Sequence, residues 1–453
     1  MNYNIYHIKD SKVPIIDRLE NTARRIIHRN AYKHINLLFN EFYQYSYSLH
    51  EARNYLLKNI LLHALENSIY YKEIVGTIEI SEDNLYNVLK EFPILTKQVI
   101  RTNYHKIKSN SNIPHKLFNT GGSTGEPFEF PLSKTSGIID YRHQKEYYLQ
   151  NNYVAGKIIA AFDGTAIPFN KRRNNKYWLR KKIGHLPYGS YRFSSHYFND
   201  ETCLHYIRKF LEIKPTFIRG YPSFIYDFVQ KLIENNIRVD FVKNVQLTAE
   251  TIYNYQIDYI KDYFNCDVYG QYGNSEATIY ALTDKNNLEY YCSPLYSFVE
   301  ILSDDNKHVS IGKEGEIVTT GFYNYIMPFI RYKTGDRAVY GGEDDGIVKL
   351  IRITGRTQEF IYDNKFNKIN ITGIVFGQHF KAFSNIKKWQ IIQNEVGKII
   401  IKIIPTEEYT KDDEEEIISN ISNQASIEVK IKICNYVELS NRGKMLLVKN
   451  NIR

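Results

Sequence analysis

The sequence of 453 residues lacks the features that mark membrane-spanning, secreted and metal-scaffold proteins. No stretch approaches the roughly 18 consecutive apolar residues that a membrane-spanning helix needs. The four cysteines lie far apart and none belongs to a CxxC pair, so the sequence suggests neither a zinc site nor a disulfide framework. The N-terminus has no apolar signal segment, and we therefore expect a cytoplasmic protein without a transmembrane segment.

Positive charge is not concentrated in one part of the chain. The net charge of +9 comes from no single basic run, so we expect no nucleic-acid partner. The densest basic stretch, residues 171–182, could contact an anionic substrate or a membrane surface, although a solvated loop and helix face is the simpler interpretation. Internal repeats and low-complexity linkers are also absent.

A glycine-rich stretch lacks the lysine of an ordinary nucleotide-binding loop. Its residues are Thr120, Gly121, Gly122, Ser123, Thr124 and Gly125. A Walker loop places lysine directly after its last glycine and a helix behind it, whereas Gly125 is followed by Glu126, Pro127 and an alternating, strand-like FEFPLS. These two departures disfavour a P-loop kinase or ATPase. Backbone N–H groups and the Ser123 and Thr124 hydroxyls can still hold polyphosphate; the alternative is a glycine-rich hairpin turn.

Periodicity predicts a large domain that mixes helices and strands. Residues 1–90 have mainly helical spacing, and strands are expected at residues 116–119 and 128–133, on either side of the glycine-rich stretch. Ser133 is a predicted helix cap. In residues 157–335, short apolar runs alternate with helical segments, and this pattern is typical of an α/β domain.

The last hundred residues form a predicted small unit of their own. Residues 388–405 have the pattern of a hairpin turning near residues 395–397, and residues 411–425 that of a helix with acids in its first turn, where the helix dipole favours them. Residues 427–439 are a further expected strand. The sequence thus predicts an α/β fold: a large domain of helices packed on β-sheets, followed by a small α+β domain.

Later motifs carry residues suited to nucleotide chemistry. In YGQYGNSEAT, residues 269–278, an aromatic ring can stack on a purine and Glu276 can hold Mg²⁺ beside phosphate. Asp336 follows a predicted Thr-Gly turn, where a carboxylate can accept hydrogen bonds from two ribose hydroxyls. Arg356 and Lys444 come from a GR and a late GK pair. The simpler readings are a surface carboxylate for Glu276, a turn cap for Asp336 and chance for the GK pair.

The order of these motifs resembles that of the adenylate-forming enzymes, which include acyl- and aryl-CoA synthetases, luciferases and peptide-synthetase adenylation domains. Within that superfamily, MPFIRYKTGD and TGRTQEFI are most similar to phenylacetate–coenzyme A ligases and to the CapK proteins of capsular polysaccharide gene clusters. RFSSHYFND, IRGYPS and LTAE are also similar to the CapK branch. The resemblance runs from about Phe92 to Lys444.

This resemblance implies an ATP-dependent, AMP-forming ligase that uses Mg²⁺. A small-molecule carboxylic acid would be activated as an acyl-adenylate with release of pyrophosphate, and the acyl group would pass to an acceptor thiol, amine or hydroxyl. The CapK relatives favour an acceptor on a sugar or other metabolite in surface polysaccharide biosynthesis, and the phenylacetate relatives favour coenzyme A as co-substrate. Residues 1–356 would form the ATP- and acid-binding adenylation domain, and residues 357–453 a mobile lid carrying Lys444.

The resemblance also implies residue roles. Residues 120–125 would hold the β- and γ-phosphates, Asp336 the ribose with support from Arg356, and Lys444 would bridge the carboxylate and the α-phosphate. Around the base and α-phosphate it implies Thr248, Ala249, Glu250, Tyr272, Gly273 and Ser275, with Glu276 on Mg²⁺. Candidates for the wall of the acid pocket are His196, Tyr221 and Ser223, with a core or surface histidine as the alternative for His196.

Two positions depart from the family pattern. Glu126 stands where many relatives have lysine, which removes a cation from the phosphate loop and adds an anion. The hinge between the domains is expected near residues 357–360, where Gln358 and Glu359 replace the Asp of many relatives. Glu126 is the one feature that favours a second hypothesis, a catalytically silent nucleotide-binding protein, and the retained Lys444 speaks against it.

Overall fold

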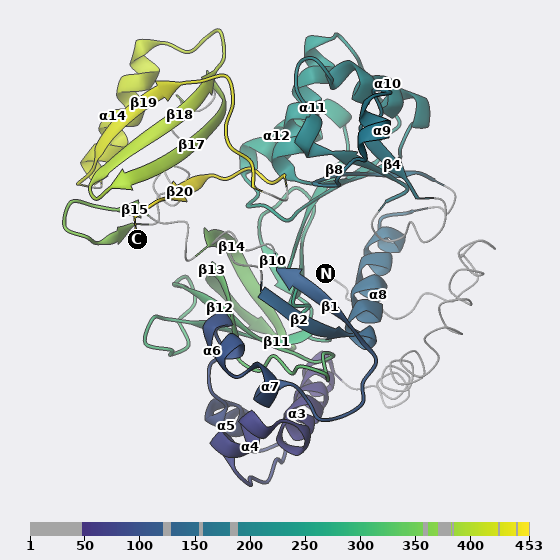
Figure 1. Cartoon of the computed structure of the whole chain (residues 1–453), viewed down its shortest axis with the longest axis vertical. Helices are drawn as coiled ribbons and strands as arrows, with labels where there is room; N and C mark the ends of the chain where they lie inside the picture. Colours follow the sequence, from purple (N-terminus) through teal and green to yellow (C-terminus); the bar gives the residue numbers. More distant parts are fainter. Residues whose placement is uncertain are drawn as a thin grey trace. The chain divides into compact units, whose positions relative to one another are not determined.

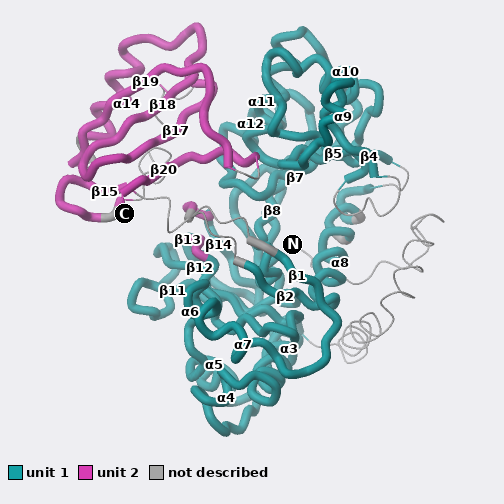
Figure 2. The backbone as a smooth tube through the Cα atoms, viewed as in Figure 1, with its two compact units in different colours: residues 1–334, 338–352 teal, residues 335–337, 353–453 magenta. Residues whose placement is uncertain are grey.

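The computed structural model describes residues 48–120, 128–153, 157–181, 189–356, 361–369, 382, 385–424, 426–440 and 443–452. The chain divides into two compact units (Figure 2). The first comprises residues up to 334 together with 338–352, and the second comprises Gly335–Arg337 and residues 353–453.

The described part of the N-terminal region is helical, as its periodicity predicts. The helices are α3 (Leu49–Asn67), α4 (Ile69–Val75), α5 (Leu85–Glu91), α6 (Lys97–Thr102) and α7 (Tyr104–Ile107). Ser48 and Glu51 form a capping box at α3, and the Thr96 side chain accepts a hydrogen bond from the Val99 N–H at the start of α6. Residues 1–47 lie outside the described part of the chain.

The glycine-rich stretch is flanked by two strands, as predicted. Strand β1 (His115–Thr120) pairs antiparallel with β2 (Phe128–Ser133), so that Thr120 lies opposite Phe128. Helix α8 (Lys134–Gln150) follows at once, and the Ser133 hydroxyl caps it by accepting from the Ser136 N–H at 3.3 Å. Residues 121–125 themselves lie outside the described residues.

A twelve-stranded mixed sheet organises the described part of the first unit. Its order is β11-β12-β13-β14-β10-β9-β8-β7-β6-β3-β5-β4. The strands are β3 (Ile159–Asp163), β4 (Trp178–Arg180), β5 (Tyr191–Ser194), β6 (Phe217–Gly220), β7 (Asn244–Thr248), β8 (Asp267–Gly273), β9 (Tyr280–Thr283), β10 (Tyr290–Cys292), β11 (Ser297–Leu302), β12 (Glu314–Gly321), β13 (Tyr332–Asp344) and β14 (Ile347–Arg356).

Helices cover both faces of the parallel part of this sheet. The short α9 (Phe169–Arg172) precedes β4, and the crossover helices are α10 (Cys203–Ile213), α11 (Pro222–Glu234) and α12 (Asn254–Phe264), which lie together beside these strands (Figure 1). Phe162 of β3 meets rings of α10 and α11, namely Phe210 and Phe228. On the other face, tyrosines of α8 pack against Ile159 and Phe217.

One local expectation is wrong. Asp336 does not follow a turn, because β13 runs without interruption from Tyr332 to Asp344. Gly335 has a φ of +81°, which glycine adopts without the steric cost that a Cβ imposes. The Thr-Gly pair therefore marks a left-handed residue inside a strand rather than the end of one.

The second unit has the predicted small α+β architecture. A four-stranded sheet has the order β19-β18-β17-β20, and among the described residues a helix packs against its β19 strand. Its elements are β17 (Ile386–Glu395), β18 (Lys398–Pro405), α14 (Lys411–Gln424), β19 (Glu428–Ile433) and β20 (Val448–Asn450), and the short β15 (Ile361–Tyr362) and β16 (Lys368–Ile369) form a separate pair. Glu395 faces Lys398 across the hairpin turn, where the sequence predicts it. The predicted α/β fold class with a small α+β unit is thus confirmed.

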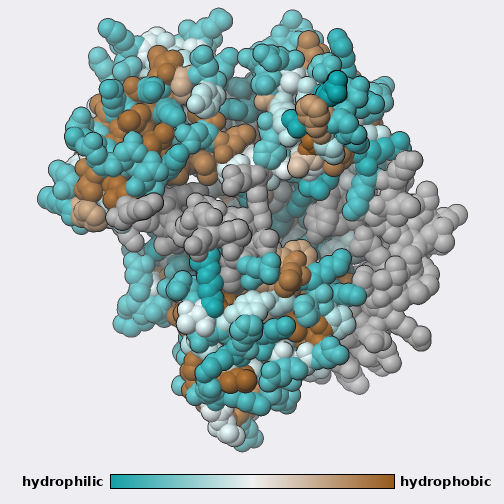
Figure 3. All heavy atoms as spheres, viewed as in Figure 1, coloured by the Kyte–Doolittle hydropathy of each residue, from teal (hydrophilic) through white to brown (hydrophobic). Residues whose placement is uncertain are grey.

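None of the helices in the described residues is long and apolar enough to cross a membrane. The face of the molecule seen in Figure 3 is largely hydrophilic, with hydrophobic residues gathered in places on both units.

Candidate functional site

Most of the predicted first-unit site residues lie at one edge of the sheet. Strands β3, β5, β6, β7 and β8 are parallel, so their carboxyl ends share an edge. His196 follows β5, Tyr221 and Ser223 follow β6, Thr248 ends β7, and Glu276 follows β8 by three residues. In open α/β sheets, ligands bind outside this edge.

Glu276 is held in a fixed position near this edge. Its side chain is 4% exposed, and Oε1 accepts a hydrogen bond of 2.7 Å from the Tyr332 hydroxyl. The surrounding loop is fixed by Asn274, whose side chain accepts from the Thr278 N–H and donates to the Thr278 hydroxyl. Ala277 has a φ of +53°, a conformation that is costly for a residue with a Cβ. A buried, oriented carboxylate on a strained loop is typical of a functional site.

The end of β7 has similar features. Ala249 has a φ of +73°, and the Glu250 Oε2 atom accepts a 3.1 Å hydrogen bond from the Ser223 N–H, which ties the end of β7 to the start of α11. The Thr248 hydroxyl donates to Gln271 Oε1 at 2.6 Å and so links β7 to β8. Hydrogen bonds therefore join Glu250 to Ser223 and, separately, Thr248 to Gln271.

The end of β8 carries Tyr272 and Gly273. The ring of Tyr272 is partly exposed and lies edge-on to Tyr290, with 6.4 Å between ring centroids. A Cβ at Gly273 would lie 2.9 Å from Gln271 Nε2 and 3.1 Å from the Ile279 carbonyl, so a side chain would not fit there without a shift. Ser275 is exposed.

The three predicted pocket residues have defined backbone anchors. His196 lies on a short 3-10 turn, Ser195–Tyr197, with Nε2 at 3.2 Å from the Gly164 carbonyl oxygen. Tyr221 is buried at the N-cap of α11, and its N–H donates to the Phe162 carbonyl at 2.9 Å. Their roles toward an acid stay predictions.

Sequence reasoning missed the partner of Glu276. Tyr332 lies within the motif MPFIRYKTGD, yet only Asp336 of that motif was assigned a role.

Asp336 is half-buried on β13, and Gly335–Arg337 belong to the second compact unit. Arg356 ends β14, and its side chain lies outside the described part, as do residues 121–125 and the predicted hinge at 357–360. The roles of all these residues stay predictions.

Lys444 lies in the second unit, and its backbone is hydrogen-bonded to Ser440. Its N–H donates to the Ser440 hydroxyl at 3.1 Å, its carbonyl accepts from the Ser440 N–H at 2.8 Å, and Gly443 has a φ of +70°. Leu439 and Met445 form a β-bridge across the turn.

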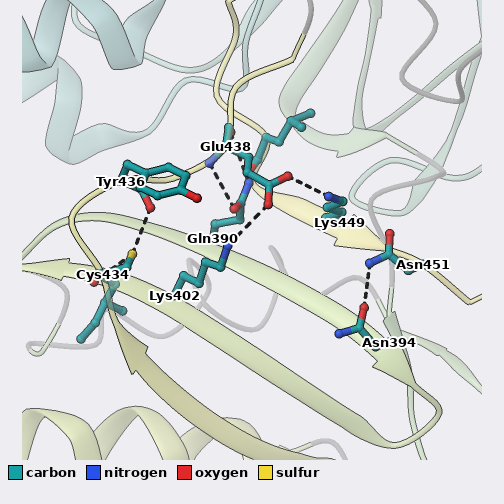
Figure 4. A network of polar contacts seen from close by, with 10 residues as sticks. Gln390, Asn394, Lys402, Cys434, Tyr436, Glu438, Lys449 and Asn451 are labelled. Atoms are coloured by element: carbon teal, nitrogen blue, oxygen red, sulfur yellow. Dashed lines mark hydrogen bonds and ion pairs between the residues drawn. The ribbon is translucent and has the colours of Figure 1, made fainter. Parts of the chain in front are cut away.

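A polar network anchors both flanks of this turn to the sheet (Figure 4). Gln390 of β17 donates from Nε2 to the carbonyls of Leu446 at 2.8 Å and Glu438 at 3.3 Å. The Glu438 carboxylate pairs with Lys449 at 2.7 Å and Lys402 at 3.4 Å. The hydrogen bond from Lys449, assisted by Lys402, lowers the pKa of Glu438 below its usual value.

A protein-built metal cluster is absent from the described residues, where no three His, Cys, Asp or Glu side chains gather. Glu276 nevertheless fits a role in Mg²⁺ binding, because proteins usually hold this ion through one or two carboxylates together with substrate phosphates.

Comparisons with known proteins find sequence relatives of this chain. Residues 364–451 match the family model of the CapK C-terminal domain. The chain is 24% identical over 428 residues to protein CapK of Staphylococcus aureus, which covers 89% of this chain and 90% of the relative.

Solved structures show the same fold at low identity. The 2-hydroxyisobutyryl-CoA ligase in complex with 2-HIB-AMP has a TM-score of 0.67 at 13% identity and covers 89% of each chain. The GH3.15 acyl acid amido synthetase has a TM-score of 0.55 at 14% identity and covers 84% of this chain and 86% of its own. The predicted resemblance is confirmed: the chain has the fold of the adenylate-forming ligases, residues 364–451 match the CapK C-terminal domain model, and the chain is similar to protein CapK over most of its length.

Proposed function

We propose that this protein is an ATP-dependent ligase that activates a carboxylic acid as an acyl-adenylate and transfers the acyl group to an acceptor. The observation that carries the proposal is the buried Glu276, oriented by Tyr332 near the carboxyl edge of the parallel strands, next to strained loops at Ala249 and Ala277. This arrangement occurs in a chain with the adenylate-forming fold.

The first half-reaction sets the demands on the site. A carboxylate oxygen attacks the α-phosphorus of ATP, the bond to the bridging oxygen breaks, and pyrophosphate leaves. Because one anion approaches a polyanion, catalysis rests on positioning and charge neutralisation. Mg²⁺, when bound, would neutralise phosphate charge, and Glu276 would hold it.

The remaining residues would position the nucleotide and the acid. Tyr272 would stack on the adenine, with Thr248, Ala249 and Glu250 along the base and Ser275 near the α-phosphate. Asp336 would accept from the ribose hydroxyls, and the residues of 120–125 would hold the departing phosphates. Lys444, on a small domain that moves about a hinge near residues 357–360, would bridge the carboxylate and α-phosphate.

The acceptor distinguishes two versions of this proposal. Similarity to protein CapK over 89% of the chain favours an amine or hydroxyl on a sugar or other metabolite, in surface polysaccharide biosynthesis in the cytoplasm. Coenzyme A is the alternative, since a 2-hydroxyisobutyryl-CoA ligase structure in complex with 2-HIB-AMP and CoA shares the fold with a TM-score of 0.54. The third candidate function is that of a catalytically silent nucleotide-binding protein, and Glu126 is the feature that favours it.

Pyrophosphate release with hydroxylamine as acceptor tests the proposal. Aryl acids, fatty acids and amino acids are screened with ATP and Mg²⁺, and the Lys444→Ala variant serves as the matched control. Release that depends on one class of acid and is lost in the variant supports the ligase. Absence of release with every acid, together with retained ATP binding, would instead support the silent binding protein.

A further inference from the structure

A row of polar side chains crosses the parallel strands on the face that α8 covers. The register places Arg219 of β6 beside Gln246 of β7, and Gln271 of β8 lies beside Thr248. These residues share a face because side chains alternate along a strand. A parallel sheet covered on both faces is normally apolar on both, so this row needs an explanation.

Each glutamine amide oxygen in the row already accepts two hydrogen bonds. Gln246 Oε1 accepts from Gln144 Nε2 of α8 at 2.7 Å and from Arg219 Nε at 3.0 Å. Gln271 Oε1 accepts from Arg219 Nη2 at 3.2 Å and from the Thr248 hydroxyl at 2.6 Å. The cluster formed by Gln144, Arg219, Gln246, Thr248 and Gln271 therefore turns its acceptors inward and presents N–H donors.

Two buried donors at this cluster have no partner of normal hydrogen-bond geometry among the described residues. They are Nε2 of Gln246, whose side chain is 0% exposed, and the hydroxyl of Tyr148 on α8, which is 1% exposed. Burial raises the pKa of Tyr148 to about 12 against the lowering effects of Arg219 and Gln144, so the hydroxyl remains a donor at neutral pH. Leaving a buried donor unsatisfied is destabilising, so each such group in a native structure calls for an explanation, such as a functional role or a bound water or ion.

The cluster is continuous with the proposed adenylation site. Thr248 ends β7 directly before Ala249, and Gln271 Nε2 borders Gly273 at the end of β8. Gln246 lies two residues before the end of its strand, which places it roughly 7 Å deeper in the sheet. An acid activated at the strand ends would thus extend its far end toward these donors.

We propose that the activated acid carries a second acceptor-rich group, a carboxylate, at the end distant from the carboxyl that is adenylated, and that Arg219, Gln246 and Tyr148 bind it. This inference rests on the proposed function and adds the class of substrate. The Arg219 guanidinium supplies positive charge, and Gln246 Nε2 and the Tyr148 hydroxyl supply the two donors, so the cluster recognises an anionic acceptor. An apolar tail would leave those two donors without a partner.

Matched pairs of acids test this specificity. Acid-dependent pyrophosphate release by the full chain is measured with adipic against hexanoic acid and terephthalic against benzoic acid. We expect kcat/KM to favour the dicarboxylic member by at least about a hundredfold, since sites built to hydrogen-bond a substrate group strongly reject analogues that lack it.

Variants then assign the preference to the cluster. Tyr148→Phe removes only the hydroxyl and is expected to reduce the preference about tenfold with little change in the melting temperature, because that hydroxyl donates no hydrogen bond of normal geometry to the described residues. Tyr147→Phe is the matched control on the same helix: its hydroxyl donates to Asn244, so the variant should be less stable but equally selective. Gln246→Leu should abolish the preference.

The outcomes separate this inference from the proposed function. Equal use of both members of each pair, or use of the monocarboxylic acids alone, would overturn the inference and leave the ligase standing. An unchanged preference in both Tyr148→Phe and Gln246→Leu would overturn the assignment to this cluster. If none of the acids supports pyrophosphate release, the proposed function is contradicted, and this inference with it.

Discussion

The hydrogen bond between Tyr332 and Glu276 offers a direct test of the candidate site. Tyr332→Phe keeps the ring and removes only the hydroxyl, which lies 2.7 Å from Glu276 Oε1. Both side chains are buried, at 0% and 4% exposed, so water cannot readily replace the lost donor. Hydrogen bonds to charged groups contribute about 1.5–3 kcal/mol.

Part of this loss should appear in catalysis, because a carboxylate without its donor no longer keeps its orientation. At about 1.4 kcal/mol for each factor of ten, the same energy corresponds to a roughly tenfold to hundredfold fall in kcat. The Mg²⁺ concentration for half-maximal activity should rise by about tenfold or more, as is typical when a group that orients a metal ligand is removed.

The assay is a Mg²⁺ titration of acid-dependent pyrophosphate release, combined with thermal unfolding. Tyr323→Phe is the matched control, because its hydroxyl is also buried but donates 2.8 Å to the neutral Leu295 carbonyl. This control should lose stability and keep its Mg²⁺ requirement. A folded Tyr332→Phe enzyme with unchanged rate and Mg²⁺ dependence would refute the role assigned to Glu276.

Three further predictions concern other parts of the molecule. Lys444→Ala should reduce ATP–pyrophosphate exchange by roughly a thousandfold, the scale of a lost transition-state contact, while ATP binding measured by calorimetry is retained; normal exchange would contradict its role. Arg331→Met should lower the free energy of unfolding in denaturant by about 3–5 kcal/mol, because it leaves Glu300 buried without the two bonds of 3.0 and 3.1 Å that Arg331 donates; a loss below about 1 kcal/mol would contradict this. The hydrogen bond from Lys449 is the main cause that lowers the folded-state pKa of Glu438. The ionised Glu438 carboxylate therefore stabilises the fold at pH values above its unfolded pKa of about 4.3, and this stabilisation is lost as the pH falls through the folded-state pKa. Wild type should therefore exceed Glu438→Gln in stability by up to about 1 kcal/mol at neutral pH, and unfolding curves that differ equally at pH values near 3 and near 7 would show that charge is not the cause.

Local pattern predicted much of the secondary structure. The strands on either side of the glycine-rich stretch, the Ser133 cap with α8 behind it, and the hairpin of β17 and β18 all follow from residues close together in the chain. The wrong turn before Asp336 shows the limit of such signals, since a glycine with positive φ can end a strand or sit within one, and only the pairing of β13 decides between them.

The sequence by itself determined the order of motifs, and through them the resemblance to adenylate-forming enzymes and the presence of Glu276, Asp336 and Lys444 as candidates. Tertiary structure decided which side chains meet. Tyr332 reaches Glu276 from 56 positions away, and the polar row of Arg219, Gln246 and Gln271 exists only because three strands align in one register. Contacts of this kind depend on strand pairing over long separations, for which a single sequence carries no local pattern.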